Sequence, residues 1–256
     1  MKKFGAFLLA GVLAIGALTG CGSTDKKAES STGSTDTQVI KVAASATPHA
    51  EILEEAKPLL AKEGYDLQVT VFDDYVQPNE VVDSGDFDAN YFQHVPYMEQ
   101  FNKEKGTKLV DAGDIHYEPF GIYPGTKKSL DEIADGDEIA VPNDATNESR
   151  ALYLLQSAGL IKLDVSGTAL ATVANIKENP KNLKITELDA SQTARSLSSV
   201  DAAVVNNTFV TEAKLDYKKA LFKEQADENS KQWYNIIVAK KDWESSPKAD
   251  AIKKII

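Results

Sequence analysis

Short apolar runs alternate with segments of helical periodicity along most of the chain. Runs rich in β-branched or aromatic residues predict three early strands, at 39–44, 67–72 and 87–92. Helical patterns lie between and after these strands, at 47–60, 78–82 and 96–104. Because strand and helix alternate as in βαβ units, we expect a mostly parallel sheet with helices on both faces.

A stretch rich in aromatic residues and proline, at 116–125, separates this series from a second one and predicts a crossing between two lobes. The second series has predicted strands at 138–141, 183–187 and 201–205 and predicted helices at 146–158 and 169–178. A last strand, at 234–239, is expected to return to the first lobe. We therefore expect a first lobe made of 38–119 and 206–256 and a second lobe made of 120–205.

The last residues continue a helical pattern up to the end of the chain. Ile252, Ile255 and Ile256 share one apolar helical face after Pro247, and no glycine or asparagine stop signal follows them. The helix is therefore expected to continue past the last residue, as in a truncated fragment.

The first residues have the pattern of a secretory signal. Lys2 and Lys3 precede an apolar run that is shorter than the roughly 20 residues of a membrane-spanning helix. The run ends in Leu-Thr-Gly-Cys21, which resembles a bacterial lipobox, whose cysteine is acylated; a chance cysteine beside a cleavage site is the alternative. We expect a lipoprotein signal peptide at 1–20, a lipid such as palmitate on Cys21, and a flexible tether at 21–37.

The composition excludes several classes of function. Among 256 residues, 39 acidic side chains outnumber 28 basic ones and give a net charge of −11, so nucleic acid is not an expected partner. One cysteine and three histidines are too few for a disulfide or for a structural zinc site of these residue types, so no metal and no cofactor are expected. The motifs of phosphate loops, dinucleotide sites, zinc proteases and serine hydrolases do not occur, so the chain is not expected to be an enzyme.

Arg150 is a candidate for binding an anion. It is one of only two arginines, and it follows 142–149 in what we expect to be the first turn of the helix at 146–158. A cation there opposes the helix dipole, whereas a ligand carboxylate held by the arginine and the free N–H groups would reverse that effect. An ion pair with Asp144 or Asp137 is the alternative.

A second group of candidates lies at strand ends, where ligands bind in open α/β sheets. The segment 90–97 contains Phe92, His94 and Tyr97 at the end of a strand and the start of a helix. Asn206 follows an apolar run, and Asn235 lies within one. Helix capping or packing is the alternative role for His94, and structural hydrogen bonds are the alternative for both asparagines.

From residue 39 to the end, the chain resembles the methionine-binding lipoproteins, which are the extracytoplasmic solute-binding components of methionine ABC importers. Several motifs carry this resemblance in the same order along the chain, namely 73–80, 88–97, 141–152, 205–209 and 234–238. The lipobox at Cys21 agrees with them independently. Several spaced motifs are more specific than any one of them alone.

The resemblance implies a two-lobed periplasmic-binding-protein fold of the α/β class, in which the ligand lies in the cleft between the lobes. It implies that Arg150 holds the carboxylate of methionine and that aromatic rings surround the thioether. The implied ligand-binding residues are Tyr75, Phe92, His94, Tyr97, Asn147, Arg150, Asn206 and Asn235. It further implies a lipid anchor on the extracytoplasmic face of the cell membrane, and a permease with a cytoplasmic ATPase as partners.

Other functions remain open on the residues alone. The ligand could be D-methionine, another amino acid or a short peptide containing methionine. An enzyme on the same fold would have His94 as its one plausible acid or base, with no evident partner. A lipid-anchored adhesin would use an exposed patch instead of a cleft.

Overall fold

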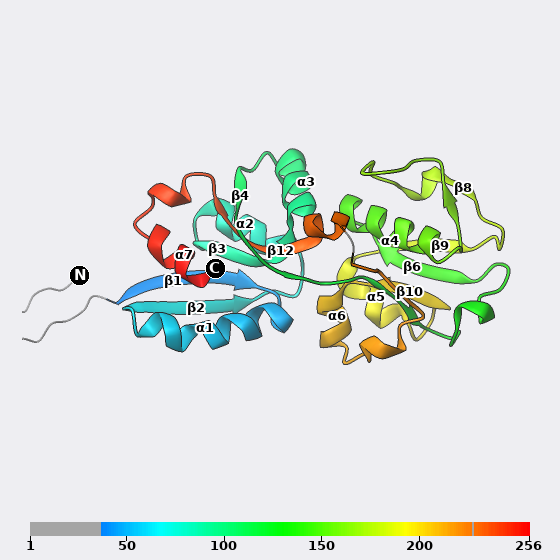
Figure 1. The fold of residues 1–256 in the computed structure, drawn as a ribbon, viewed down its shortest axis with the longest axis horizontal. Coiled ribbons are helices and arrows are strands. Elements are labelled where there is room, and N and C mark those ends of the chain that lie inside the picture. Colours follow the sequence, from blue (N-terminus) through cyan, green and yellow to red (C-terminus); the bar gives the residue numbers. More distant parts are fainter. Residues whose placement is uncertain (1–36, 227) are drawn as a thin grey trace, which may run out of the picture. The chain divides into compact units, whose positions relative to one another are not determined.

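The computed structural model describes residues 37–226 and 228–256, and the expected signal peptide, Cys21 and the tether up to residue 36 lie outside them. Two five-stranded sheets, each flanked by helices, form two lobes (Figure 1). The expected two-lobed α/β class is confirmed. No helix in the described ranges is both long and apolar enough to cross a membrane.

The first lobe is built on a sheet with the strand order β2-β1-β3-β12-β4. Its strands are β1 (Gln38–Ala44), β2 (Tyr65–Val71), β3 (Ala89–His94), β4 (Leu109–Tyr117) and β12 (Tyr234–Lys240). Its helices are α1 (Glu51–Ala61), α2 (Gln77–Ser84), α3 (Val95–Lys105) and α7 (Ala249–Ile255). Ile40 of β1 packs with Leu53 of α1 and Ile252 of α7, which fixes these helices on the sheet.

The second lobe is built on a sheet with the order β11-β5-β10-β6-β9. Its strands are β5 (Gly121–Pro124), β6 (Glu138–Pro142), β9 (Lys184–Leu188), β10 (Ala202–Val205) and β11 (Phe222–Lys223), beside a small pair formed by β7 (Lys162–Leu163) and β8 (Ile176–Glu178). Its helices are α4 (Ala145–Ser157), α5 (Ala190–Ser196) and α6 (Asn207–Glu212). Leu152 and Leu155 of α4 are fully buried against the sheet.

Each sheet is mostly parallel, as expected, with one strand that runs in the opposite direction, β12 in the first sheet and β5 in the second. In the first sheet β1 runs parallel to β2 and β3, whereas β12 is antiparallel to β3 and β4. In the second sheet β6 is parallel to β9 and β10, whereas β5 is antiparallel to β10 and β11. The antiparallel strands are the ones that carry the chain from one lobe to the other.

The expected lobe boundary at residue 206 needs correction. Phe209 and Val210 of α6 are buried in the core of the second lobe, and β11 pairs with β5 in the second sheet. The chain therefore returns to the first lobe between 224 and 233 rather than at 206. The first crossing, between β4 and β5 at 118–120, falls within the stretch predicted for it.

The helix expected at 169–178 does not form. The structure has a short 3-10 turn at Val173–Asn175 and strand β8 in its place. The side-chain oxygen of Asn175 accepts a hydrogen bond from the backbone N–H of Thr172 at 3.0 Å, and such local bonds compete with helix formation.

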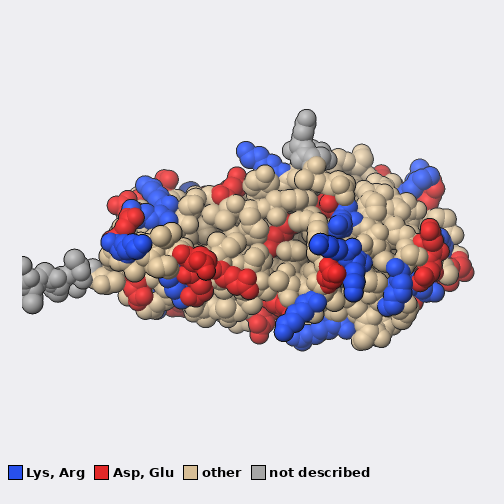
Figure 2. Space-filling view, turned by 60° about the horizontal axis from the view of Figure 1, so that its bottom comes forward, with Lys and Arg blue, Asp and Glu red and all other residues tan. Residues whose placement is uncertain are grey.

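The face of the molecule in Figure 2 carries charges of both signs. Figure 2 shows acidic and basic side chains close to one another over both lobes.

Candidate ligand-binding site between the lobes

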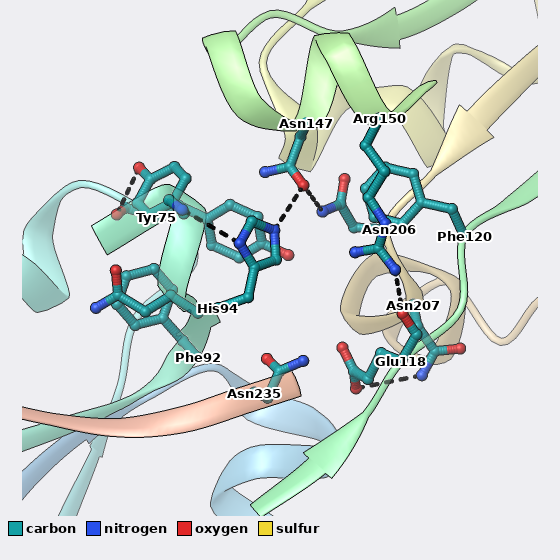
Figure 3. Close-up of a pocket in the computed structure, with 12 residues that line it drawn as sticks. Tyr75, Phe92, His94, Glu118, Phe120, Asn147, Arg150, Asn206, Asn207 and Asn235 are labelled. Atoms are coloured by element: carbon teal, nitrogen blue, oxygen red, sulfur yellow. Dashed lines mark hydrogen bonds between the residues drawn. The ribbon is translucent and has the colours of Figure 1, made fainter. Parts of the chain in front are cut away.

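A pocket lies between the two lobes (Figure 3). The structure brings all eight predicted ligand-binding residues into its lining, which consists of Tyr75, Phe92, Gln93, His94, Tyr97, Glu118, Phe120, Asn147, Arg150, Asn206, Asn207 and Asn235. The first lobe supplies the aromatic side and the second lobe most of the polar side.

Three aromatic rings of the first lobe pack into one wall of the pocket. The ring centroids of Tyr75, Phe92 and Tyr97 lie between 5.5 and 6.0 Å from one another. The hydroxyl of Tyr97 donates a hydrogen bond to the backbone oxygen of Tyr75 at 2.9 Å, which fixes the ring of Tyr97. Phe209 of the second lobe lies 5.1 Å from Tyr75, between ring centroids, and extends the wall across the cleft.

His94 ends β3 and caps the N-terminus of α3. Its Nδ1 accepts a hydrogen bond from the backbone N–H of Tyr97 at 3.2 Å, so its proton is on Nε2. Nε2 faces Oδ1 of Asn147 in the second lobe at 3.3 Å. Burial, together with the charge of Arg150, lowers the pKa of His94 to about 3. The imidazole is therefore neutral at neutral pH and serves both as a helix cap and as a contact between the lobes.

Asn147 and Asn206 present amide groups to the pocket from the second lobe. Nδ2 of Asn147 donates to both carboxylate oxygens of Asp144, which also caps the start of α4 by accepting from the backbone N–H of Asn147. Oδ1 of Asn147 accepts from Nδ2 of Asn206 at 3.3 Å. Oδ1 of Asn206 is buried and has no hydrogen-bond partner among the described residues, so it is an acceptor available to a ligand.

Arg150 lies in the second turn of α4 rather than in the first, because the helix begins at Ala145. The backbone N–H of Asn147, in the first turn, donates a hydrogen bond to the side chain of Asp144. The guanidinium forms a two-pronged ion pair with Glu224, at 3.0 Å from Nε and 2.5 Å from Nη2, and Nη2 also donates to the backbone oxygen of Glu118.

The partner of Arg150 is thus neither Asp144 nor Asp137, the two that the sequence suggested. The guanidinium carbon also lies 4.1 Å from the ring centroid of Phe120 and 4.6 Å from that of Trp233, an arrangement typical of cation–π contacts. Nη1 forms no hydrogen bond with a described residue. The arginine is therefore buried, held rigidly and left with one nitrogen to offer the pocket.

Glu118 is the charged pocket residue that sequence reasoning missed. It lies in the crossing after β4, its side chain is buried, and its Oε1 accepts a hydrogen bond from Nδ2 of Asn207 at 3.3 Å. Burial alone would raise the pKa of Glu118, but the nearby imidazoles of His116 and His49 outweigh it and lower the pKa. The only sequence signal for Glu118 is its place in the stretch 116–125, which predicts the crossing.

The pocket therefore offers a carboxylate and a guanidinium to one small molecule, beside an aromatic wall. Two α/β lobes joined by crossing segments around such a pocket define the class of two-lobed solute-binding proteins (Figure 1). Within this class the chain belongs to the NlpA lipoprotein family, whose pattern matches residues 40–256.

Named relatives cover almost the whole chain. It is 41% identical over 262 residues to the methionine-binding lipoprotein MetQ of Bacillus subtilis, covering 100% of this chain and 92% of the relative. It is 41% identical over 260 residues to the D-methionine-binding lipoprotein MetQ of Escherichia coli O157:H7, covering 99% of this chain and 90% of the relative. The crystal structure of the substrate-binding protein of a methionine transporter from Streptococcus pneumoniae superposes with a TM-score of 0.82 at 65% identity, over 85% of this chain and 86% of that one.

Proposed function

We propose that this protein captures methionine outside the cytoplasm and delivers it to an ABC importer. The observation that carries the proposal is the pocket between the lobes, in which a carboxylate, a guanidinium and an aromatic wall converge. An amino acid is a zwitterion with one side chain, and this arrangement provides a group for each of its three parts. The names of the relatives support methionine as the side chain in question.

The two charged residues take the two charged ends of the ligand. Glu118 accepts from the ammonium group, because it is a buried carboxylate whose lowered pKa keeps it ionised. Arg150 donates from Nη1 to the ligand carboxylate, and Asn147, Asn206 and Asn235 complete the polar end. Hydrogen bonds between ionised groups in a buried site are stronger than neutral ones, so this polar end is expected to supply most of the affinity.

The aromatic wall receives the side chain. Contacts between sulfur and aromatic rings are favourable by about 0.3 to 1.5 kcal/mol each, which favours a thioether over an alkyl chain in the space beside Tyr75, Phe92 and Tyr97. Apolar pockets separate similar side chains by only about 1 to 3 kcal/mol. Leucine and norleucine are therefore expected to bind measurably, but more weakly than methionine.

The role is binding rather than catalysis. His94 is a poor general base at neutral pH, since its pKa is about 3 and its Nδ1 is used as a helix cap. We further propose that a lipid on Cys21 anchors the protein on the extracytoplasmic face of the cell membrane. A permease with a cytoplasmic ATPase would accept the ligand there.

Isothermal titration calorimetry tests the ligand. We expect one L-methionine bound per chain, with weaker heats for leucine and norleucine. Titrations with D-methionine and with a glycyl-methionine dipeptide show whether the pocket also accepts these forms. Mass spectrometry of protein purified without added ligand provides an independent readout, since a buried ligand can be retained. Absence of binding to methionine in either form would overturn the proposal.

A further inference from the structure

We propose that His49, His116 and Glu118 form a binding site for a divalent transition-metal ion of the Zn²⁺ type. His49 precedes α1, and His116 and Glu118 lie at the end of β4 and in the crossing that follows it. One potential ligand atom from each residue lies within 4.8 Å of the other two. The site shares Glu118 with the pocket between the lobes, but the argument for it does not depend on the identity of the amino-acid ligand.

The three side chains converge from two segments that are far apart in sequence. His49 is fully buried and Glu118 nearly so, while the side chain of His116 is 22% exposed, which leaves a path for an ion. Nε2 of His116 lies 3.2 Å from Oε1 of Glu118, and the ring centroids of His49 and His116 are 5.2 Å apart.

In His49 and in His116, one ring nitrogen lies within hydrogen-bond distance of an oxygen atom. Nε2 of His49 donates to Oδ1 of Asn235 at 2.9 Å, so Nδ1 of His49 carries a lone pair. Nδ1 of His116 lies 2.5 Å from the hydroxyl of Tyr91. Histidines that bind metals have this arrangement, in which an oxygen atom fixes the ring through the nitrogen that does not face the ion.

The other ring nitrogen of each histidine has no hydrogen-bond partner among the described residues. Nδ1 of His49 and Nε2 of His116 are both buried and unpaired, although Nε2 lies at ion-pair distance from Glu118. Buried polar atoms are normally satisfied, so two unpaired nitrogens in one cluster with a buried carboxylate point to a ligand that all three residues share.

The residue types and spacing suit zinc. Two histidines and one glutamate are a known ligand set for Zn²⁺, with a fourth position open to water. In a tetrahedral site with bonds of about 2.0 to 2.1 Å, ligand atoms are about 3.3 Å apart. His116 and Glu118 already have this separation, and a small movement of the His49 side chain would bring the third ligand atom into the same arrangement. Counting only cysteines and histidines missed this site, because the third ligand is a carboxylate.

Titration with Zn²⁺ and Co²⁺ tests the site. The full chain would carry Cys21→Ser, so that no thiol competes, and would be treated with a chelator and dialysed first. We expect calorimetry to show one Zn²⁺ per chain, and Co²⁺ to give the visible absorption of a four-coordinate site. His116→Gln should weaken Zn²⁺ binding at least a hundredfold. Tyr91→Phe, which leaves the ligands in place, should weaken it about 10- to 100-fold.

His94→Gln is the matched control, because His94 is the remaining histidine of the chain and lies in the pocket. It should retain the affinity for Zn²⁺. If His116→Gln does not fold by circular dichroism, Glu118→Gln removes the anionic ligand without changing its shape and should cause the same loss. The proposal is overturned if no ion binds with one-to-one stoichiometry at micromolar concentration, if binding survives both ligand substitutions, or if His94→Gln abolishes it.

Discussion

Nε2 of His94 in the first lobe lies 3.3 Å from Oδ1 of Asn147 in the second, so a hydrogen bond joins the lobes across the pocket. Each residue also belongs to a helix start, because His94 caps α3 and the backbone N–H of Asn147 binds the cap of α4. The contact between the lobes is therefore positioned by two helix termini rather than by flexible surface side chains. We infer that this bond helps to set the distance between the two walls of the pocket.

Asn147→Ala should weaken methionine binding by roughly tenfold to a hundredfold. The substitution removes the acceptor for both His94 and Asn206, and each buried hydrogen bond contributes about 0.5 to 1.5 kcal/mol. Calorimetry measures the effect. Asn143→Ala is the control, since Asn143 is exposed and precedes the same helix, and its affinity should match that of the parent protein. Equal affinities for both variants would show that the amide of Asn147 does not contribute.

The two lobes should close on the ligand. The groups expected to bind opposite ends of methionine lie on different lobes, and the chain passes between the two sheets after β4 and again between β11 and β12. Small-angle scattering should therefore show a smaller radius of gyration after methionine is added. An unchanged profile, with ligand shown to be bound by calorimetry, would argue that the lobes do not hinge.

Arg150→Ala should weaken methionine binding a hundredfold or more, since about 3 kcal/mol is expected for a lost charge-assisted contact. It should also destabilise the protein by about 3 to 5 kcal/mol, because Glu224 would lose its partner in a nearly buried ion pair. Calorimetry and urea denaturation measure the two effects.

Glu224→Gln separates these two effects of Arg150. This variant loses the ion pair but keeps the guanidinium beside the pocket, so stability should fall while methionine binding changes much less than in Arg150→Ala. If Arg150→Ala binds methionine as tightly as the parent protein, the carboxylate is held by other groups, and Asn206 and Asn235 become the next residues to substitute.

Local pattern was enough to predict most elements of the first lobe. The strands around Val42 and Phe92 formed as expected, because their apolar runs are long enough to be buried in a sheet whatever their neighbours are. The lobe boundary could not be found in this way. The sequence around Phe209 and Val210 predicts a helix but does not indicate the lobe to which it belongs. Their packing against the second sheet decides this.

The candidate site shows the same limit. Motif resemblance located Arg150 and His94, but the partner of Arg150 is Glu224, which is 74 residues away in sequence. A pairing over that distance depends on the path of the chain between the lobes, and no local pattern encodes it. Glu118 was missed for the related reason that an isolated glutamate has no signal of its own until the fold buries it.

Cys21→Ala should release the protein from the membrane or leave it unprocessed. Acylation needs the thiol, and Cys21 is the only cysteine of the chain. Fractionation of a host that carries the lipoprotein pathway, with immunoblotting of the membrane and soluble fractions, measures the outcome. Cys21→Ser is a more conservative substitution at the same residue and should have the same effect. Continued attachment of both variants to the membrane would rule out a lipid on this residue.

Acidification should destabilise the protein through His94. The pKa of this residue is about 3 in the folded protein, against an ordinary value of 6.5, so the unfolded chain binds more protons between these limits. The free energy of unfolding therefore falls as pH decreases below 6.5, and between pH 7 and pH 5 His94 contributes a loss of about 2 kcal/mol. Urea denaturation at both pH values, compared between the parent protein and His94→Gln, isolates this contribution, because His49 and the carboxylates titrate in both proteins. The parent protein should lose about 2 kcal/mol more than the variant. Equal losses would mean that His94 becomes protonated without disturbing the folded state, and that its contacts with Tyr97 and Asn147 do not require a neutral ring.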